Sequence, residues 1–278
     1  MPEAAAPGPD AEVWIAACRR ACDRIAHDMS AMSPAQRSET RGRGAGGDIT
    51  VAVDRLAEDI VLEELGAVGR PLTVISEEVG EIDLRGGGEG VIVVVDPIDG
   101  SLNAKRGLPI FSTSIAIAEG RTMADVTLGF VRDHGTGEEW IAERGRGAWL
   151  DGARLAALTP SPSGVLDLLL VEGAYPARVS RAAAFLEGRV GRLRALGSLA
   201  LSLCQTAAGR GDAMVGLGRG RAIDVAAAQL VALEAGLVVG MPGAADLPGT
   251  PLDLTGRFHI AAAHDEAGLA LMRRTLRE

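Results

Sequence analysis

Residues 91–103 read Val-Ile-Val-Val-Val-Asp-Pro-Ile-Asp-Gly-Ser-Leu-Asn. Five β-branched residues in a row are typical of a strand that is buried on both faces. The predicted strand ends in Asp-Pro and Asp-Gly, two turn-forming pairs that each carry a carboxylate. A buried strand that delivers two carboxylates and a glycine turn at its end predicts a site for a hard cation and a phosphate.

The turn itself offers several ligand atoms. Asp96 and Asp99 are three residues apart, and the backbone carbonyl of Ile98 between them is an acceptable oxygen ligand for a hard cation. Gly100 leaves its N–H open to a phosphate oxygen, and Ser101 adds a hydroxyl. The turn therefore supplies ligands for both a cation and an anion.

A further carboxylate, Glu77, follows the predicted strand 71–75. Such carboxylates are costly to assemble without cations, whereas two Mg²⁺ ions can clamp the attacking water and the leaving oxygen of a phosphoryl transfer. Taken singly, the Asp-Pro-x-Asp-Gly turn, the Glu77 strand end and Asp224 at a helix start are also common structural features. An EF-hand is excluded, because Ile98 and Gly107 stand where that loop needs oxygen ligands.

Composition narrows the class of protein. The chain has 278 residues, enough for two lobes, and a net charge of −9, which disfavours a general nucleic-acid or acidic-membrane binder. No apolar run reaches the roughly 20 residues that span a bilayer, and residues 1–10 lack the features of a signal peptide. We predict a disordered tail over 1–10. The three cysteines suggest no disulfide framework, and the predicted location is cytoplasmic.

The order of predicted elements divides the chain into two lobes. Residues 11–158 form a predicted α+β lobe, with a helix over 10–32 and a second helix capped by Asp54. Residues 34–47 predict a flexible flap beside the substrate, because they end in Arg-Gly-Arg-Gly-Ala-Gly-Gly; an RNA-binding reading of that segment lacks aromatic residues. Residues 159–278 alternate strands and helices as in α/β domains, and end in a predicted strand over 258–263 and a helix over 266–276.

Several ordered motifs resemble one family. Residues 96–103 resemble the first signature of the inositol monophosphatase family, and residues 222–228, followed by Glu-Ala-Gly at 234–236, resemble its second. Shorter matches occur in the expected order, at 47–50 with Asp54, 76–78, 143–148 and 197–198. The resemblance covers residues 11–276. It implies a layered αβαβα fold, usually dimeric, that hydrolyses phosphate monoesters with two or three Mg²⁺ ions and is often inhibited by Li⁺.

The resemblance also implies roles for individual residues. The implied Mg²⁺ ligands are Glu77, Asp96, the Ile98 carbonyl, Asp99 and Asp224. Asp48 is expected near the nucleophilic water, helped by the Ser101 hydroxyl. The implied substrate contacts are Asp99, the N–H groups of Gly100 and Ser101, and the segment Gly197, Ser198 and Leu199.

Departures from the family pattern concern the substrate. Leu217 stands where inositol-specific members carry an acidic residue, Ile223 replaces a usual tryptophan and Ala104 a usual aromatic residue. The sequence is more similar to archaeal-type members that act on both inositol phosphate and fructose 1,6-bisphosphate. We predict that Arg219 and Arg221 meet a second phosphate, with plain surface charge as the alternative.

The predicted function is Mg²⁺-dependent hydrolysis of a small phosphate monoester, either inositol monophosphate or a related sugar or polyol phosphate, by a homodimer. Fructose 1,6-bisphosphate, histidinol phosphate and a nucleotide 3′-phosphate stay open as substrates. A hypothesis of a different class is a catalytically silent relative that binds phosphate or protein as a regulator. The presence of every ligand carboxylate and of Asp48 favours the enzyme.

Overall fold

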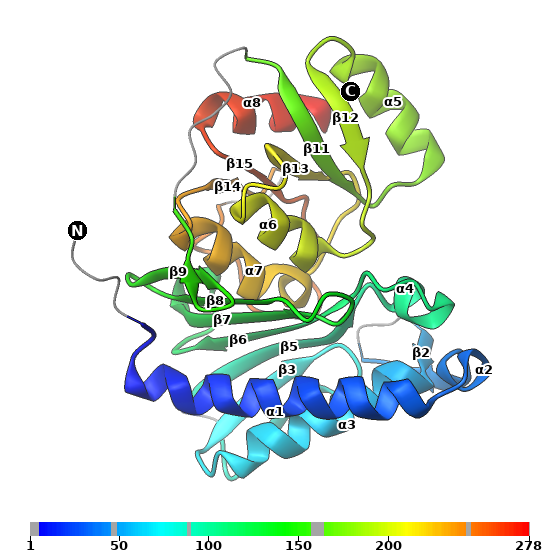
Figure 1. Cartoon of the computed structure of the whole chain (residues 1–278). Helices are drawn as coiled ribbons and strands as arrows, with labels where there is room; N and C mark the ends of the chain where they lie inside the picture. The colour runs from blue at the N-terminus through cyan, green and yellow to red at the C-terminus, as the bar shows by residue number, and fades with distance from the viewer. Residues whose placement is uncertain (1–5, 46–48, 88–89, 157–163, 243–245, 278) are drawn as a thin grey trace.

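The computed structural model describes residues 6–45, 49–87, 90–156, 164–242 and 246–277 (Figure 1). Five layers are stacked from bottom to top in Figure 1: helices, a sheet, helices, a second sheet and helices. This arrangement confirms the predicted αβαβα fold. Among the described residues, no helix is both long enough and apolar enough to cross a membrane.

The larger sheet has eight strands in the order β10-β9-β8-β7-β6-β5-β3-β4. Their bounds are β3 Leu72–Ser76, β4 Gly80–Leu84, β5 Val91–Asp99, β6 Ser112–Ala118, β7 Val126–Asp133, β8 Glu139–Glu143, β9 Gly147–Leu150 and β10 Ala153–Arg154. The smaller sheet has the order β12-β11-β13-β15-β14. Its strands are β11 Leu166–Glu172, β12 Val190–Arg194, β13 Ala213–Gly216, β14 Val238–Gly240 and β15 Ala261–Ala263. A short hairpin pairs β1 (Thr40–Arg43) with β2 (Ile49–Val51).

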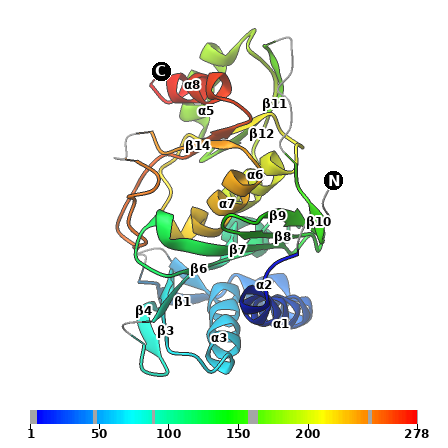
Figure 2. The same cartoon turned by 90° about the vertical axis from the view of Figure 1, so that its left-hand side faces the viewer.

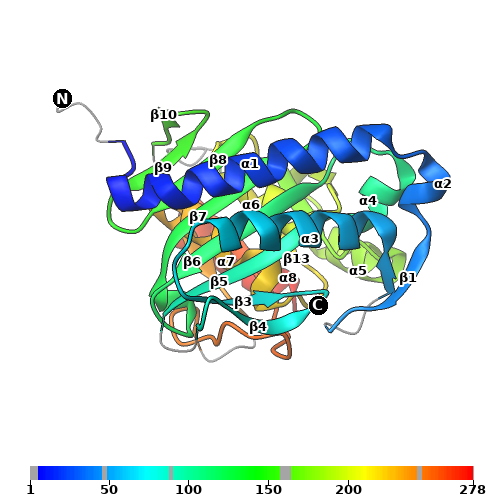
Figure 3. The ribbon, with the colours of Figure 1, turned by 90° about the horizontal axis from the view of Figure 1, so that it is seen from below.

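Helices form the other three layers. They are α1 Pro9–Ala31, α2 Pro34–Arg37, α3 Ala52–Ala67, α4 Ser101–Arg106, α5 Pro176–Leu186, α6 Leu199–Ala207, α7 Ala222–Glu234 and α8 Glu266–Thr275, with a 3₁₀ turn at Met123–Asp125. Seen from below, α1 and α3 lie side by side across the larger sheet (Figure 3). The apolar face of α1 buries Cys18 and Cys22. All three cysteines are free, in agreement with a sequence that suggests no disulfide framework.

Helix α7 lies between the two sheets (Figure 2). Every residue from Ala222 to Ala232 is buried, because most of them are alanine or valine and both sides of the helix face packed layers. The approach to the larger sheet is close: a Cβ added at Gly129 in β7 would lie 2.5 Å from the carbonyl oxygen of Ala227. One apolar cluster therefore runs from the larger sheet through α6 and α7 to the smaller sheet.

Strand β5 confirms the strand predicted from the β-branched run, and it continues to Asp99. It pairs in parallel with β3 and antiparallel with β6, with a register shift between Asp96 and Asp99. Because β3 and β5 are parallel, their carboxyl ends meet at one edge of the sheet. Glu77, the residue after β3, therefore lies near Asp96 and Asp99.

Four local predictions are wrong. Helix α1 begins at Pro9, so the predicted tail does not include Pro9 and Asp10. The predicted flap contains α2 and β1, while Asp48 lies outside the described residues. Asp54 is the third residue of α3 and not its N-cap, which is Val51. The predicted strand 258–263 is a strand only at 261–263. Phe258 instead forms an isolated bridge with Gly220.

Candidate active site

Three carboxylates converge at the carboxyl edge of the larger sheet. Glu77 follows β3, Asp96 lies in β5 and Asp224 lies in the first turn of α7. One carboxylate oxygen from each of them lies within 4.8 Å of the others. Asp99 lines the same cavity, which has a volume of about 240 Å³. The structure thus brings together the four acidic residues predicted as metal ligands.

Burial and mutual repulsion disfavour the charged forms of these acids. Burial raises the pKa of Glu77 to about 7, even though the neighbouring Arg221 opposes the shift, and raises the pKa of Asp99 to about 7. Burial, with the charges of Glu77 and Asp99, raises the pKa of Asp96 well above its usual range, and burial also raises that of Asp224. A buried set of carboxylates that repel one another suits a divalent cation, which prefers oxygen ligands and offsets their charge. The donor set therefore fits a hard metal ion.

The Ile98 peptide is fixed within this cavity. Its N–H donates to Asp96 Oδ1 at 3.1 Å, and its carbonyl accepts the Ser101 hydroxyl at 2.8 Å. Since a carbonyl oxygen has two lone pairs, the bond from Ser101 does not prevent the same oxygen from binding a cation. The predicted metal contact of Ile98 stays a prediction.

Gly100 is required at the turn between β5 and α4. Its φ is 95°, a conformation that favours glycine, and an added Cβ would lie 3.1 Å from the carbonyl of Gly197. The turn can therefore pack against the 196–199 segment, and α4 starts immediately afterwards at Ser101. The first N–H groups of a helix have no partner within the helix, so this turn is suited to an anion.

The 196–199 segment is held from two sides. From the larger sheet, Asp99 Oδ2 accepts the Ser198 hydroxyl and the Ala200 N–H, the latter at 2.7 Å. From the smaller sheet, the buried Glu172 accepts the N–H groups of Leu196 at 2.8 Å and Gly197 at 2.9 Å. These bonds place the predicted substrate segment beside a predicted metal ligand.

Glu172, the last residue of β11, was not predicted as a site residue from the sequence. The strand continues through Glu172, whose carboxylate also accepts the Ser202 hydroxyl at 2.6 Å. The available signal was an acidic residue at the end of an apolar strand, the pattern that identified Glu77.

Asp54 is a second residue of the site to which the sequence analysis assigned no role. Its carboxylate lines the metal cavity together with Ser101. Oδ2 accepts the Val51 N–H at 3.3 Å, and Oδ1 is buried with no hydrogen-bond partner in the described part of the chain. Burial, more than the nearby charge of Glu78, raises the pKa of Asp54 to about 6. A carboxylate with that pKa can exchange a proton near neutral pH.

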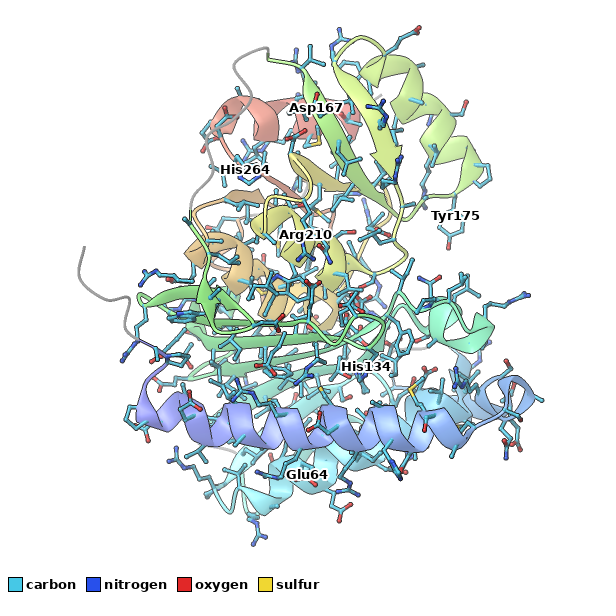
Figure 4. The ribbon with its side chains drawn as sticks, in the orientation of Figure 1. Glu64, His134, Asp167, Tyr175, Arg210 and His264 are labelled. Atoms are coloured by element: carbon cyan, nitrogen blue, oxygen red, sulfur yellow. The ribbon has the colours of Figure 1, made fainter. Side chains whose placement is uncertain are left out.

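The two predicted phosphate-binding arginines are separated in the structure. Arg221 lines the metal cavity with Leu199, whereas Arg219 is exposed and lines a neighbouring cavity of about 620 Å³. Arg178, Arg181 and Tyr175 line that second cavity as well. Figure 4 shows Tyr175 projecting on the same side of the molecule as α4. Arg219 and Arg221 thus line different cavities, and their predicted contact with a second phosphate stays a prediction.

Comparison with known proteins gives a consistent result. The sequence pattern of the inositol monophosphatase family matches residues 9–277. Fructose-1,6-bisphosphatase/inositol-1-monophosphatase from Methanothermobacter thermautotrophicus is 35% identical over 246 residues, 84% of this chain and 86% of the relative. Nus factor SuhB from Escherichia coli is 33% identical over 239 residues, 83% and 84% of the two chains. A solved inositol monophosphatase–fructose 1,6-bisphosphatase has a TM-score of 0.82 at 25% identity, over 95% of this chain and 99% of the other. The chain belongs to the inositol monophosphatase family.

Proposed function

We propose that the chain hydrolyses a small phosphate monoester, namely inositol monophosphate or a related sugar or polyol phosphate, with Mg²⁺. The observation that carries the proposal is the set of Glu77, Asp96 and Asp224 oxygens within 4.8 Å of one another, beside the glycine turn at the start of α4. Two or three Mg²⁺ ions and a homodimer belong to the same proposal, and the family resemblance supports them. A cytoplasmic location is proposed from the sequence, because its three cysteines suggest no disulfide framework.

In this proposal Glu77, Asp96, Asp99, Asp224 and the Ile98 carbonyl hold the metal. When bound, Mg²⁺ supplies Lewis-acid chemistry: it polarises a phosphoryl oxygen and makes a water more acidic. The N–H groups of Gly100 and Ser101 hold the phosphate, and Gly197, Ser198 and Leu199 contact the alcohol part of the substrate.

In this proposal, Ser101 and Asp54 orient the water and move its proton. Ser101 donates its own proton to the Ile98 carbonyl, so the hydroxyl oxygen can accept a hydrogen bond from the attacking water and orient it. Asp54 lines the same cavity, and with a pKa of about 6 it can take up a proton near neutral pH. Asp48, the residue predicted beside this water, lies outside the described residues, so its role stays a prediction.

A phosphate-release assay on a panel of monoesters tests the proposal. With MgCl₂ we expect turnover on the order of 1–1,000 s⁻¹ for at least one of inositol monophosphate, fructose 1,6-bisphosphate, histidinol phosphate and a nucleotide 3′-phosphate, and none with excess EDTA. Absence of phosphate release from the whole panel with Mg²⁺ would favour the silent, regulatory alternative.

The arginines of the second cavity favour fructose 1,6-bisphosphate as a second candidate substrate. In the part of the chain that the structure describes, Arg178, Arg181 and Arg219 form no ion pair with a carboxylate, although the chain carries a net charge of −9. Unpaired guanidinium groups around one cavity suit a phosphate, because the planar fork matches its oxygens. The segment 217–221 borders both cavities, because Leu217, Gly218 and Arg219 line this one and Arg221 lines the metal cavity.

Alanine variants of these arginines measure the second phosphate contact. We expect Arg219→Ala and Arg178→Ala to raise KM for fructose 1,6-bisphosphate about tenfold and KM for inositol monophosphate less than about twofold, since a lost charged hydrogen bond is worth about 1.5–3 kcal/mol. Arg192→Ala, on the exposed surface of the edge strand β12, is the matched control and should change neither. Equal increases for both substrates would assign these arginines a general charge effect.

A further inference from the structure

Arg221 is the cationic side chain closest to the predicted metal ligands. Its Nη2 lies 2.7 Å from Glu77 Oε1 and 3.3 Å from Asp224 Oδ1, and its Nε donates to Asp224 Oδ1 at 3.3 Å. The side chain is only 11% exposed. The guanidinium therefore binds two of the three carboxylates that converge on the metal position.

Helix stability does not explain this placement. Arg221 immediately precedes α7, and a positive charge at the N-terminus of a helix is unfavourable because the helix dipole is positive there. Burial also disfavours a guanidinium and lowers its pKa, yet the charges of Asp224, Glu77 and Asp96 outweigh that effect and raise the pKa of Arg221. The acidic cluster thus holds the Arg221 side chain at a place where both the helix dipole and burial disfavour a positive charge.

A metal ion needs the same oxygens. Mg²⁺ binds carboxylate oxygens, and a positive charge on a neighbouring guanidinium repels it in a cavity where charges are poorly screened. We propose that Arg221 is a built-in competitor of the metal, which must displace the guanidinium from Glu77 in order to bind and which therefore binds more weakly than the carboxylates alone would allow. The inference rests on the proposed function only in that the cluster binds a divalent cation.

Arg219 offers a matched control within the same segment. It is two residues away, exposed, and lines the second cavity instead of the metal cavity. Removing Arg219 changes the net charge by the same amount as removing Arg221 but removes no contact with Glu77 or Asp224. The pair of variants therefore separates direct competition from a general charge effect.

Isothermal titration calorimetry of the full chain with MgCl₂ tests the inference without any substrate. For Arg221→Met, which keeps the length of the side chain and removes its charge, we expect the dissociation constant of Mg²⁺ to fall at least about tenfold. For Arg219→Met we expect a change of less than about twofold. In EDTA, the melting temperature of Arg221→Met should be lower than that of the wild type by roughly 2–4 °C, because the carboxylates lose their counter-charge.

The outcomes are distinct. Unchanged or weaker Mg²⁺ binding by folded Arg221→Met would overturn the inference and show that Arg221 organises the ligands. Equal tightening of Mg²⁺ binding in Arg219→Met would overturn the inference in favour of a long-range charge effect.

If Arg221→Met does not fold, Arg221→Lys replaces it. The lysine ammonium cannot bridge both carboxylates as a guanidinium does, so we expect tighter Mg²⁺ binding than in the wild type, and equal or weaker binding overturns the inference. A chain that binds Mg²⁺ but releases no phosphate would contradict the proposed function and leave this result unaffected.

Discussion

The Asp96→Asn variant is expected to release phosphate at least about a thousandfold more slowly than the wild-type chain with saturating Mg²⁺. The carboxylate of Asp96 is buried, lies within 4.8 Å of a Glu77 and an Asp224 oxygen, and also accepts the Ile98 N–H. An amide keeps the shape of the side chain but loses the charge and one ligand oxygen. The measurement is steady-state phosphate release, with Mg²⁺ affinity from calorimetry beside it.

Two controls separate loss of chemistry from loss of fold. Asp167→Asn makes the same chemical change at an exposed position on β11 and should leave activity within about twofold, as surface changes usually do (Figure 4). In EDTA, Asp96→Asn should unfold at a temperature equal to or above that of the wild type, because burial and the charges of Glu77 and Asp99 already disfavour an ionised carboxylate at this position. A fully active Asp96→Asn variant would remove Asp96 from the site.

In EDTA, the free energy of unfolding is expected to fall as the pH rises from about 4 to about 7. Burial raises the pKa of Glu77 and of Asp99 to about 7, from ordinary values near 4. A carboxyl whose pKa is raised by folding favours the folded state while it is protonated. That contribution is complete below the unfolded pKa and disappears as the pH passes the folded pKa. Since one pKa unit corresponds to about 1.4 kcal/mol, we expect a loss of several kcal/mol from the two acids together.

Denaturant titrations between pH 4.5 and 8 measure this slope. Saturating Mg²⁺ should flatten or reverse it, because a bound cation favours the ionised carboxylates. Glu77→Gln should show a shallower slope than the wild type in EDTA. A free energy of unfolding that rises with pH in EDTA would contradict the pKa assignments of both acids.

The metal cluster could be predicted because its signals are local in the sequence. The β-branched run fixed a buried strand, and the residues after it carried the carboxylates. Glu77 alone could be a solvated strand end and Asp224 alone a helix cap, and the family resemblance was needed to predict both as metal ligands. The sequence did not predict which strands pair; the parallel pairing of β3 with β5 in the structure is what brings Glu77 to the same edge of the sheet as Asp96.

The remaining site residues depend on contacts between distant segments. Asp54 had an adequate local explanation as a helix cap, and its place in the motif match at 47–50 came with no assigned role. Arg178 and Arg219 line one cavity from two segments about forty residues apart, and no periodicity reveals such a meeting. Arg219 and Arg221 looked equivalent in the sequence. In the structure the backbone N–H of Arg221 donates to Asp224 Oδ2 at 2.7 Å, and only Arg221 of the two lines the metal cavity.

The close contact between Gly129 and Ala227 has a consequence for how the family site can vary. Because α7 carries Asp224 at its start and small side chains along its length, the thickness of the layer between the sheets is fixed by the smallest residues in it. A larger side chain at position 129 would push α7 away from β7, and Asp224 would move with the helix. The position of Asp224 thus depends on alanine and glycine residues that do not contact the metal site. The second cavity is lined from α5 and the 217–221 segment, so its residues can change without moving the metal ligands.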